Sequence, residues 1–303
     1  MAIELAPAEG VVHDQDGVLA RPQAYALFGR HHTEAQIAAH RWQRPARGVI
    51  VMHNGPLTPA QQDWVALLAC APGSVLGGLT ALGYDGFTGF ADEVRTVVQP
   101  MGARRPSYED LDVRWSIWLD SQDVHPLRLP PRTRPARSLV DAASWQHFVR
   151  RARAIILAGV QQQLVATRHL REAMIRRGSC KHRALIVESI LDAHGGVQSL
   201  PELDFEHIRR RIGAPPPTRQ SVRRRKDGKC YLDVEWVEYE TGCEIHGIPH
   251  IRVLSWESDL ERANEITIDG PRLLIFSSYA VRREQERVAD QLLRMLRRGG
   301  WRG

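Results

Sequence analysis

The chain has 303 residues, 43% of them hydrophobic, and its 41 Lys and Arg against 35 Asp and Glu give a formal net charge of +6. This length suits two or three domains, and the modest basic excess suits an anionic partner. No stretch reaches the ~20 apolar residues of a membrane span, the start lacks a signal-peptide pattern, and the four cysteines form no CxxC pair. We therefore expect a cytoplasmic protein without a membrane partner, a disulfide framework or a zinc knuckle.

Residues 1–56 are expected to form a winged helix-turn-helix domain. Residues 33–41 have the pattern of a short helix that is capped by Thr33 and turns Ile37 inward. The basic segment RWQRPAR follows and leads into the β-branched run GVIVM, which is typical of a wing. A small helical domain with a basic hairpin and no DNA contact is the open alternative.

Residues 57–195 are expected to form a mixed α/β and helical middle region. Thr58 begins a helix that places Trp64 on its apolar face. Further helices are expected over 75–82, 136–143, 152–176 and 182–193, and strands over 94–98 and 113–119. The region shows no obvious chemistry, because His147 and His169 have no acid or cysteine at ligand spacing. We interpret it as a scaffold.

Residues 196–303 have the order helix, three strands, helix, strand, helix, which predicts a separate α/β core. The helices are expected over 200–212, 256–266 and 282–297, and the strands over 218–225, 229–239, 242–246 and 273–277. Asp227 and Gly228 predict a tight turn between the first two strands, since this pair tolerates positive backbone angles.

Two neighbouring strands of this core carry acids and a histidine. Asp233 lies on one strand, and Glu244 and His246 lie on one face of the next. Like carboxylates at close quarters repel unless a cation or a proton intervenes. Carboxylate oxygens suit Mg²⁺ or Mn²⁺, which retain waters for a phosphate substrate. The pattern predicts a metal site with Asp233, Glu244 and His246 as ligands.

Two further residues are candidates for the same chemistry. Glu202 is placed to add a third acid, or it is an acid favoured by the N-terminal end of its helix. His246 or His250 can move a proton, because imidazole titrates near neutrality. His250 follows Pro249 in an expected loop, so a surface histidine is the alternative.

Basic residues crowd into a short part of this region. They are Arg209, Arg210, Arg211, Arg219, Arg223, Arg224, Arg225, Lys226 and Lys229. Such a cluster can face the phosphates of double-stranded DNA. For any single arginine, a solvated charged face is the simpler reading.

Several motifs of the C-terminal third, in order, resemble a known nuclease family. They are SLPELDF with Glu202, PPPTRQ with Gln220, KCYLDVEW with Asp233, CEIHGIPH with Glu244, His246 and His250, and WESDLERANE with Asp259, Arg262 and Asn264. The region from about residue 199 to the end is similar to the DUF559 domain, a relative of the very-short-patch-repair endonucleases in the PD-(D/E)xK superfamily. The segments GVIVMHNGPLTPAQQDWVALLACAPGSVLGGLTAL and RTRPARSLVDAA resemble the AbiEi-type antitoxin region.

The resemblance implies a restriction-endonuclease-like α/β core with a mixed central sheet, behind a winged-helix and AbiEi-like region. It implies Mg²⁺-dependent cutting of DNA, with Gln220, Arg262 and Asn264 near the substrate. A strand end and a salt bridge within one helix are the plain alternatives for these residues. The family usually has an acid where this chain has His246, although the very-short-patch-repair enzymes also place a histidine before the glycine.

Three functions therefore stay open. The first is a metal-dependent DNA endonuclease or nickase, with a mismatch- or damage-directed enzyme as its narrower form and a homodimer as one open arrangement. The second is a DNA-binding transcriptional regulator or antitoxin-like protein whose nuclease fold is catalytically decayed. The third is a protein-interaction scaffold, which would not bind heparin, whereas the basic cluster predicts salt-dependent binding of polyanions.

Overall fold

The computed structural model describes residues 7–90, 94–109, 111–117, 119, 121–193, 202–224, 230–246, 260, 264 and 273–303. The chain separates into two compact units, and each is mixed α/β. The N-terminal unit comprises Met1–Ile155 and Gln162–Ile186, and the C-terminal unit comprises Ile156–Gln161 and Val187–Gly303. Over these described ranges, no helix is both long enough and apolar enough to cross a membrane.

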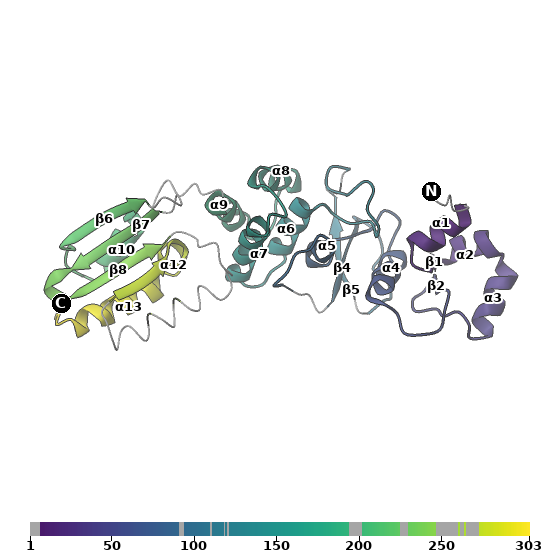
Figure 1. Ribbon diagram of the computed structural model, residues 1–303, viewed down its shortest axis with the longest axis horizontal. Coiled ribbons are helices and arrows are strands. Elements are labelled where there is room, and N and C mark those ends of the chain that lie inside the picture. The colour runs from purple at the N-terminus through teal and green to yellow at the C-terminus, as the bar shows by residue number, and fades with distance from the viewer. Residues whose placement is uncertain are drawn as a thin grey trace, which may run out of the picture. The chain divides into compact units, whose positions relative to one another are not determined.

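The N-terminal unit begins with short helices and a pair of short strands (Figure 1). In chain order they are α1 (Pro7–Asp14), β1 (Val18–Ala20), α2 (Arg21–Phe28), α3 (Arg30–Ala38) and β2 (Val49–Val51). β1 and β2 are antiparallel with Val18 opposite Val51, and Gln43 forms an additional antiparallel bridge to Val51. The strand before the helix pair is thus joined to the strand that follows it.

The predicted start of α3 is wrong. Thr33 lies inside α3, where its side chain is buried and its hydroxyl donates a hydrogen bond to the Gly29 carbonyl at 2.9 Å. A helical threonine often bonds back to the carbonyl four residues earlier, so its polarity alone does not mark a helix start. Gly29, with φ of 80°, makes the turn between α2 and α3 instead.

The next part of the N-terminal unit is a helix followed by a three-stranded sheet. Thr58 caps α4 (Pro59–Ala69) and accepts a hydrogen bond from the Gln61 amide, as the sequence predicts for this start. The sheet has the order β3-β4-β5, with β3 antiparallel to β4 and β4 parallel to β5. Its strands are β3 (Val75–Leu76), β4 (Arg95–Pro100) and β5 (Leu111–Ser116).

The helix expected over 75–82 divides into β3 and α5 (Gly78–Tyr84). Gly78 has a φ of 56°, and a Cβ added there would lie 2.7 Å from the Trp145 ring. The glycine therefore lets the backbone turn against a large aromatic side chain, which an apolar pattern cannot reveal.

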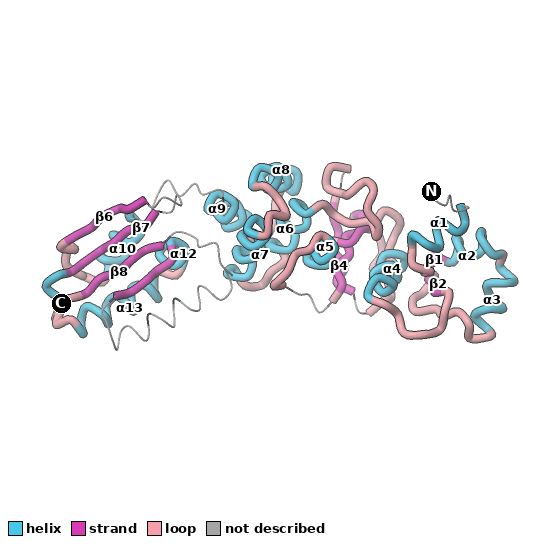
Figure 2. Tube along the Cα trace, in the orientation of Figure 1, coloured by secondary structure: helices cyan, strands magenta, loops and turns pink. Residues whose placement is uncertain are grey.

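Four helices follow (Figure 2). They are α6 (Pro135–Ser144), α7 (Val149–Gln161), α8 (Thr167–Arg177) and α9 (Arg183–Ala193). The single helix expected over 152–176 is wrong, because α7 ends and Gln163 adopts a positive φ of 58° before α8 begins. α6 and α9 agree with the expectation.

Arg137, in the first turn of α6, is the centre of a buried group of charges. Its side chain is 1% exposed and donates to Asp123 at 2.6 Å and to Asp141 at 2.7 Å. The same two carboxylates accept from Arg176 and Arg177 of α8, at 2.9 and 2.7 Å. These ion pairs fasten α6 to α8 and to the segment before α6.

The C-terminal unit is built on a four-stranded sheet of order β6-β7-β8-β9. β6, β7 and β8 are antiparallel in succession, and β9 is parallel to β8, so the expected mixed sheet is present. Between β8 and β9, Leu260 and Asn264 are helical. The elements are α10 (Glu202–Arg211), β6 (Arg219–Arg224), β7 (Cys230–Trp236), a 3-10 turn (Val237–Tyr239), β8 (Thr241–His246), β9 (Leu273–Ser277), α12 (Ser278–Arg283) and α13 (Gln285–Arg298).

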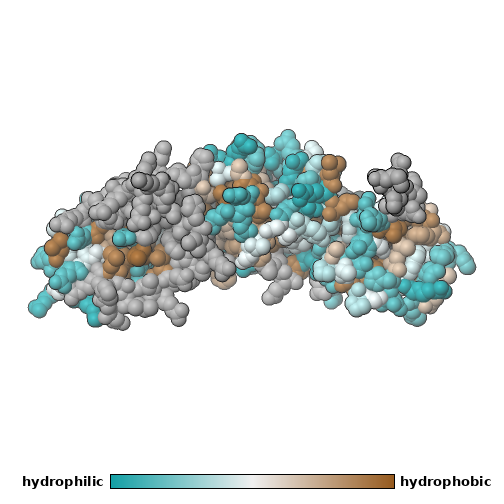
Figure 3. Space-filling model, in the orientation of Figure 1, coloured by the Kyte–Doolittle hydropathy of each residue, from teal (hydrophilic) through white to brown (hydrophobic). Residues whose placement is uncertain are grey.

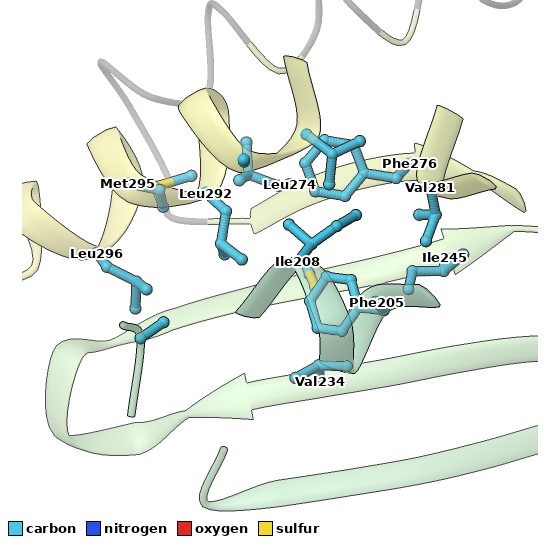
Figure 4. Packing of buried hydrophobic residues seen from close by; sticks show 14 of the residues in the cluster. Phe205, Ile208, Val234, Ile245, Leu274, Phe276, Val281, Leu292, Met295 and Leu296 are labelled. Carbon is cyan, nitrogen blue, oxygen red and sulfur yellow. The ribbon is translucent and has the colours of Figure 1, made fainter. Parts of the chain in front are cut away.

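One face of this sheet is packed against helices, as Figure 4 shows. α10 contributes Phe205 and Ile208, and α13 contributes Leu292, Met295 and Leu296, all of them buried. The sheet side of this core consists of Val234, Trp236, Cys243, Ile245, Leu274 and Phe276. Burial thus falls on alternate strand positions, and the positions between them belong to the opposite face.

Candidate active site

Asp233 and Glu244 are direct neighbours across the β7–β8 pair. The antiparallel register places Asp233 opposite Glu244 and Tyr231 opposite His246. Directly opposed residues in such a pair have Cβ atoms about 4.5–5.5 Å apart. The backbone therefore brings the two predicted carboxylates to adjacent positions, and His246 follows on the same strand.

These positions alternate with the core. Val234 and Trp236 on β7 are buried, as are Cys243 and Ile245 on β8, so Asp233, Glu244 and His246 occupy positions of the other face. The Glu244 side chain is partly exposed. The side chains of Asp233 and His246 lie outside the described atoms.

β9 completes this part of the sheet. It is parallel to β8 and places Ile275 opposite Glu244 and Ser277 opposite His246. Ser277 accepts a hydrogen bond from the Ala280 amide at 3.0 Å and so caps α12. The sequence does not identify this serine as a site residue, although a serine before an apolar helix is a recognisable cap signal.

The predicted DNA-contacting residues of β6 divide between two faces. By register, Arg219 and Arg223 are opposite Glu235 and Tyr231, on the side of Asp233. Gln220 is opposite the buried Val234, and Arg224 is opposite Cys230, so their positions belong to the core side. Because side chains alternate along the strand, only half of these residues occupy the face that carries the two carboxylates.

Three predicted site residues, Arg225, His250 and Arg262, lie outside the described residues. Glu202 is the first residue of α10, and its side chain is outside them too. Over the described atoms, no group of three or more His, Cys, Asp or Glu side chains is arranged to hold a metal ion. The described atoms leave out the side chains of Asp233 and His246.

Asn264 holds the sheet and does not face a substrate. It is 1% exposed, its amide nitrogen donates to the Ile275 carbonyl at 2.8 Å, and its oxygen accepts from the Ile275 amide at 2.7 Å. The same nitrogen also donates to Gln291 of α13 at 3.3 Å. These bonds use both the nitrogen and the oxygen of the side-chain amide. Asn264 therefore stabilises β9 beside Glu244 and does not make the predicted contact with nucleic acid.

The arginines of α10 are held by nearby acids. Arg209 and Arg210 donate to Glu206 at 2.5 and 2.6 Å, and Arg211 pairs with Glu286 of α13 at 2.6 Å. Hydrogen bonds from Arg209, and then from Arg210, lower the pKa of Glu206 from 4.5 to about 2. Arg210 remains largely exposed, but the end of α10 is not a row of unopposed cations.

Glu206→Gln tests this ion-pair group. A carboxylate whose folded pKa is lowered stabilises the fold above its ordinary pKa of 4.5, and this contribution disappears as the pH falls towards 2. We expect the variant to lose about 0.5–1 kcal/mol of unfolding free energy at pH 7, since the group is partly exposed. Urea unfolding at several pH values should show that loss shrinking below pH 4.5. Glu286→Gln, which removes a far more exposed partner, is the control and should change less; an effect of Glu206→Gln that is constant with pH would contradict the assignment.

The exposed surface of α2, α3 and the segment before β2 is basic. Residues 21–47 contain five arginines and one acid, Glu34. Glu34 is paired with Arg44 and accepts a hydrogen bond from Tyr25. Exposed arginines of this stretch include Arg21, Arg30, Arg41 and Arg47. A surface of this charge is suited to phosphates.

Comparison with models of known protein families gives no match, and no curated protein matches the chain.

Proposed function

We propose that this protein is a metal-dependent DNA endonuclease or nickase. The observation that carries the proposal is the direct opposition of Asp233 and Glu244 on β7 and β8. The order of the C-terminal elements supports it: a helix, three antiparallel strands, helical residues at 260 and 264, and a parallel strand. The resemblance to PD-(D/E)xK nucleases implies an α/β core with a mixed central sheet, and this order is compatible with such a core.

The donor set fits Mg²⁺ or Mn²⁺, because two carboxylates supply hard oxygen ligands and imidazole is acceptable to Mn²⁺. A bound cation of this kind would lower the pKa of a water and neutralise charge on the phosphate. Asp233 and Glu244 would hold it from adjacent strands, and His246 would serve as a further ligand or accept the proton of the attacking water. Asn264 binds the backbone of Ile275, the β9 residue that lies opposite Glu244.

Binding to duplex DNA is assigned to the basic residues of both units. The order α1-β1-α2-α3-β2, with Gln43 bridging to Val51, agrees with a winged helix in which α3 enters the major groove. The exposed arginines between 21 and 47 supply the charge for the backbone. In the C-terminal unit, Arg219 and Arg223 occupy positions on the side of Asp233.

A second candidate is a DNA-binding regulator that keeps the nuclease fold without its activity. It is favoured by one feature, His246 at a position where the related family usually has an acid. A regulator would bind duplex DNA equally well with and without Mg²⁺ and would leave it intact. The damage- or mismatch-directed form of the nuclease depends on the resemblance alone.

Supercoiled plasmid and mismatched duplexes, incubated with Mg²⁺, Mn²⁺ or EDTA, separate the two candidates. The nuclease proposal expects nicked or linear product with metal and none with EDTA or with Asp233→Ala. His246→Ala, run beside them, reports whether the imidazole is essential. Intact DNA that still shifts on a gel, with equal affinity in Mg²⁺ and EDTA, would overturn the nuclease in favour of the regulator.

A further inference from the structure

The N-terminal unit contains a cavity of about 480 Å³ at the start of α6. Its wall includes basic side chains from three places in the chain: Arg128 and Arg134 before α6, Arg137 in α6 and Arg176 in α8. His125 and His169 also line it. Cavities of this size accommodate small organic ligands. In Figure 3 the surface in the region of α8 is mainly hydrophilic.

The charge of this cavity is net positive over its described surroundings. Arg128 and Arg132 share Asp85, and Arg137, Arg176 and Arg177 share Asp123 and Asp141. Arg134 and Glu172 also line the wall. Together with the residues of these ion pairs, they make six arginines around four carboxylates. Burial first, and then Arg128 and Arg134, lower the pKa of His125 in the cavity wall. An anion is therefore the ligand that this wall would attract.

The N-terminal end of α6 faces the same space. Arg134, Pro135, Ala136 and Arg137 all line the cavity, and α6 begins at Pro135. The N-cap residue, Arg134, provides no side-chain hydrogen bond to the first turn. The amides at such a helix end favour a negatively charged oxygen. Arg137 is fixed by Asp123 and Asp141, so this part of the wall is preorganised.

A second feature points to a ligand with a donor group. Asp85 lines the cavity with its side chain 7% exposed, and its Oδ1 accepts from Arg128 and Arg132 at 3.0 and 3.4 Å. Its Oδ2 has no hydrogen-bond partner among the described residues, and neither has the Arg132 Nε. A buried acceptor without a partner is costly and rare in folded proteins. Because Oδ2 is itself buried, a ligand hydroxyl would satisfy it only after the neighbouring wall side chains shift.

We infer that this cavity binds a small phosphate monoester that also carries hydroxyl groups, such as a sugar phosphate or a nucleoside monophosphate. The phosphate lies at the start of α6 between Arg134 and Arg176, and a hydroxyl lies towards Asp85. This site is distinct from the carboxylates of β7 and β8 and does not depend on nuclease activity.

Isothermal titration calorimetry of the full chain tests the site with ribose 5-phosphate and AMP, and with ribose, adenosine and inorganic phosphate as comparisons. We expect both monoesters to bind, ribose and adenosine not to bind, and phosphate to bind more weakly than either monoester. Arg134→Ala should weaken monoester binding at least about tenfold, as expected for loss of a hydrogen bond to a charged group. Arg105→Ala, a change at an exposed arginine outside the cavity wall, is the matched control and should bind as the wild type does.

Circular dichroism and the thermal midpoint establish that Arg134→Ala is folded, which its exposed position favours. The inference is overturned if neither monoester binds at millimolar concentration, or if folded Arg134→Ala binds as tightly as Arg105→Ala. It is also overturned if a duplex oligonucleotide displaces the monoester and itself depends on Arg134, because the cavity would then be a contact for DNA phosphates.

Discussion

Glu244→Gln is expected to reduce metal-dependent cutting of plasmid DNA by at least about a thousandfold, the scale set by losing several kcal/mol of metal-assisted stabilisation. Glutamine preserves the size of the side chain and removes its negative charge, so a cation shared with Asp233 loses one anionic ligand. Because Glu244 is partly exposed on the face opposite the core, the fold should tolerate the change. The rate of nicking of supercoiled plasmid in Mg²⁺ measures the effect.

A control variant and a double variant test whether this effect is specific to the metal site. Glu238→Gln removes an exposed carboxylate from the turn that follows β7, and it should leave the rate within about twofold of wild type, as for an ordinary surface change. Combining Asp233→Asn with Glu244→Gln should be no slower than either alone, because both act through one cation. Full activity in Glu244→Gln, with DNA binding unchanged, would remove this residue from the site.

Arg137→Ala is expected to destabilise the N-terminal unit by about 3–5 kcal/mol, the usual cost of removing one partner from a buried ion pair. The side chain is 1% exposed and lies between Asp123 and Asp141, each also 1% exposed. Its loss removes the cation between two buried carboxylates, which keep their ion pairs with Arg176 and Arg177. Scanning calorimetry, which separates transitions of different units, measures the change.

Arg134→Ala is the matched control for that experiment, since Arg134 lies three residues earlier in the chain and is exposed. It should unfold within about 0.5 kcal/mol of the wild type. If Arg137→Ala unfolded at the same temperature as Arg134→Ala, the ion pairs around α6 would contribute nothing measurable.

Much of the C-terminal fold could be predicted from the sequence because its signals are local. Alternation along β7 and β8 separates Val234 and Trp236 from Asp233, and this same period sets which residues are opposed once the strands pair. The predicted turn at Asp227 and Gly228 lies outside the described residues, but the antiparallel pairing on either side of it agrees with a hairpin. The expected final helix divides at Glu284 into α12 and α13, which the continuous helical pattern does not indicate.

The parts that could not be predicted depend on contacts distant in sequence. In the sequence Arg137 is one more basic residue, yet it pairs with Asp123 and Asp141. The same two carboxylates also pair with Arg176 and Arg177 of α8, which are distant in the chain. Asn264 likewise resembles a substrate-binding residue until β9 is placed beside it. The middle region, which shows no chemistry as a pattern, acquires a charged cavity only when three separate segments meet.

The predicted helix boundaries in the N-terminal unit were wrong for a related reason. Thr33 is a residue type that often caps helices, but its hydroxyl forms its hydrogen bond inside α3. Gly78 interrupts an apolar run because Trp145 leaves no space for a side chain. In both cases a tertiary or backbone contact overrides local propensity.

The central claim, that the opposed carboxylates of β7 and β8 hold a divalent cation, is tested most directly by Mn²⁺ binding. Electron paramagnetic resonance of free Mn²⁺, titrated with the full chain in the presence and absence of duplex DNA, measures the bound fraction. We predict that the wild type and Glu238→Gln remove Mn²⁺ from solution and that folded Asp233→Asn/Glu244→Gln does not. Equal binding by the folded double variant, or no binding by the wild type even with DNA, would contradict the claim.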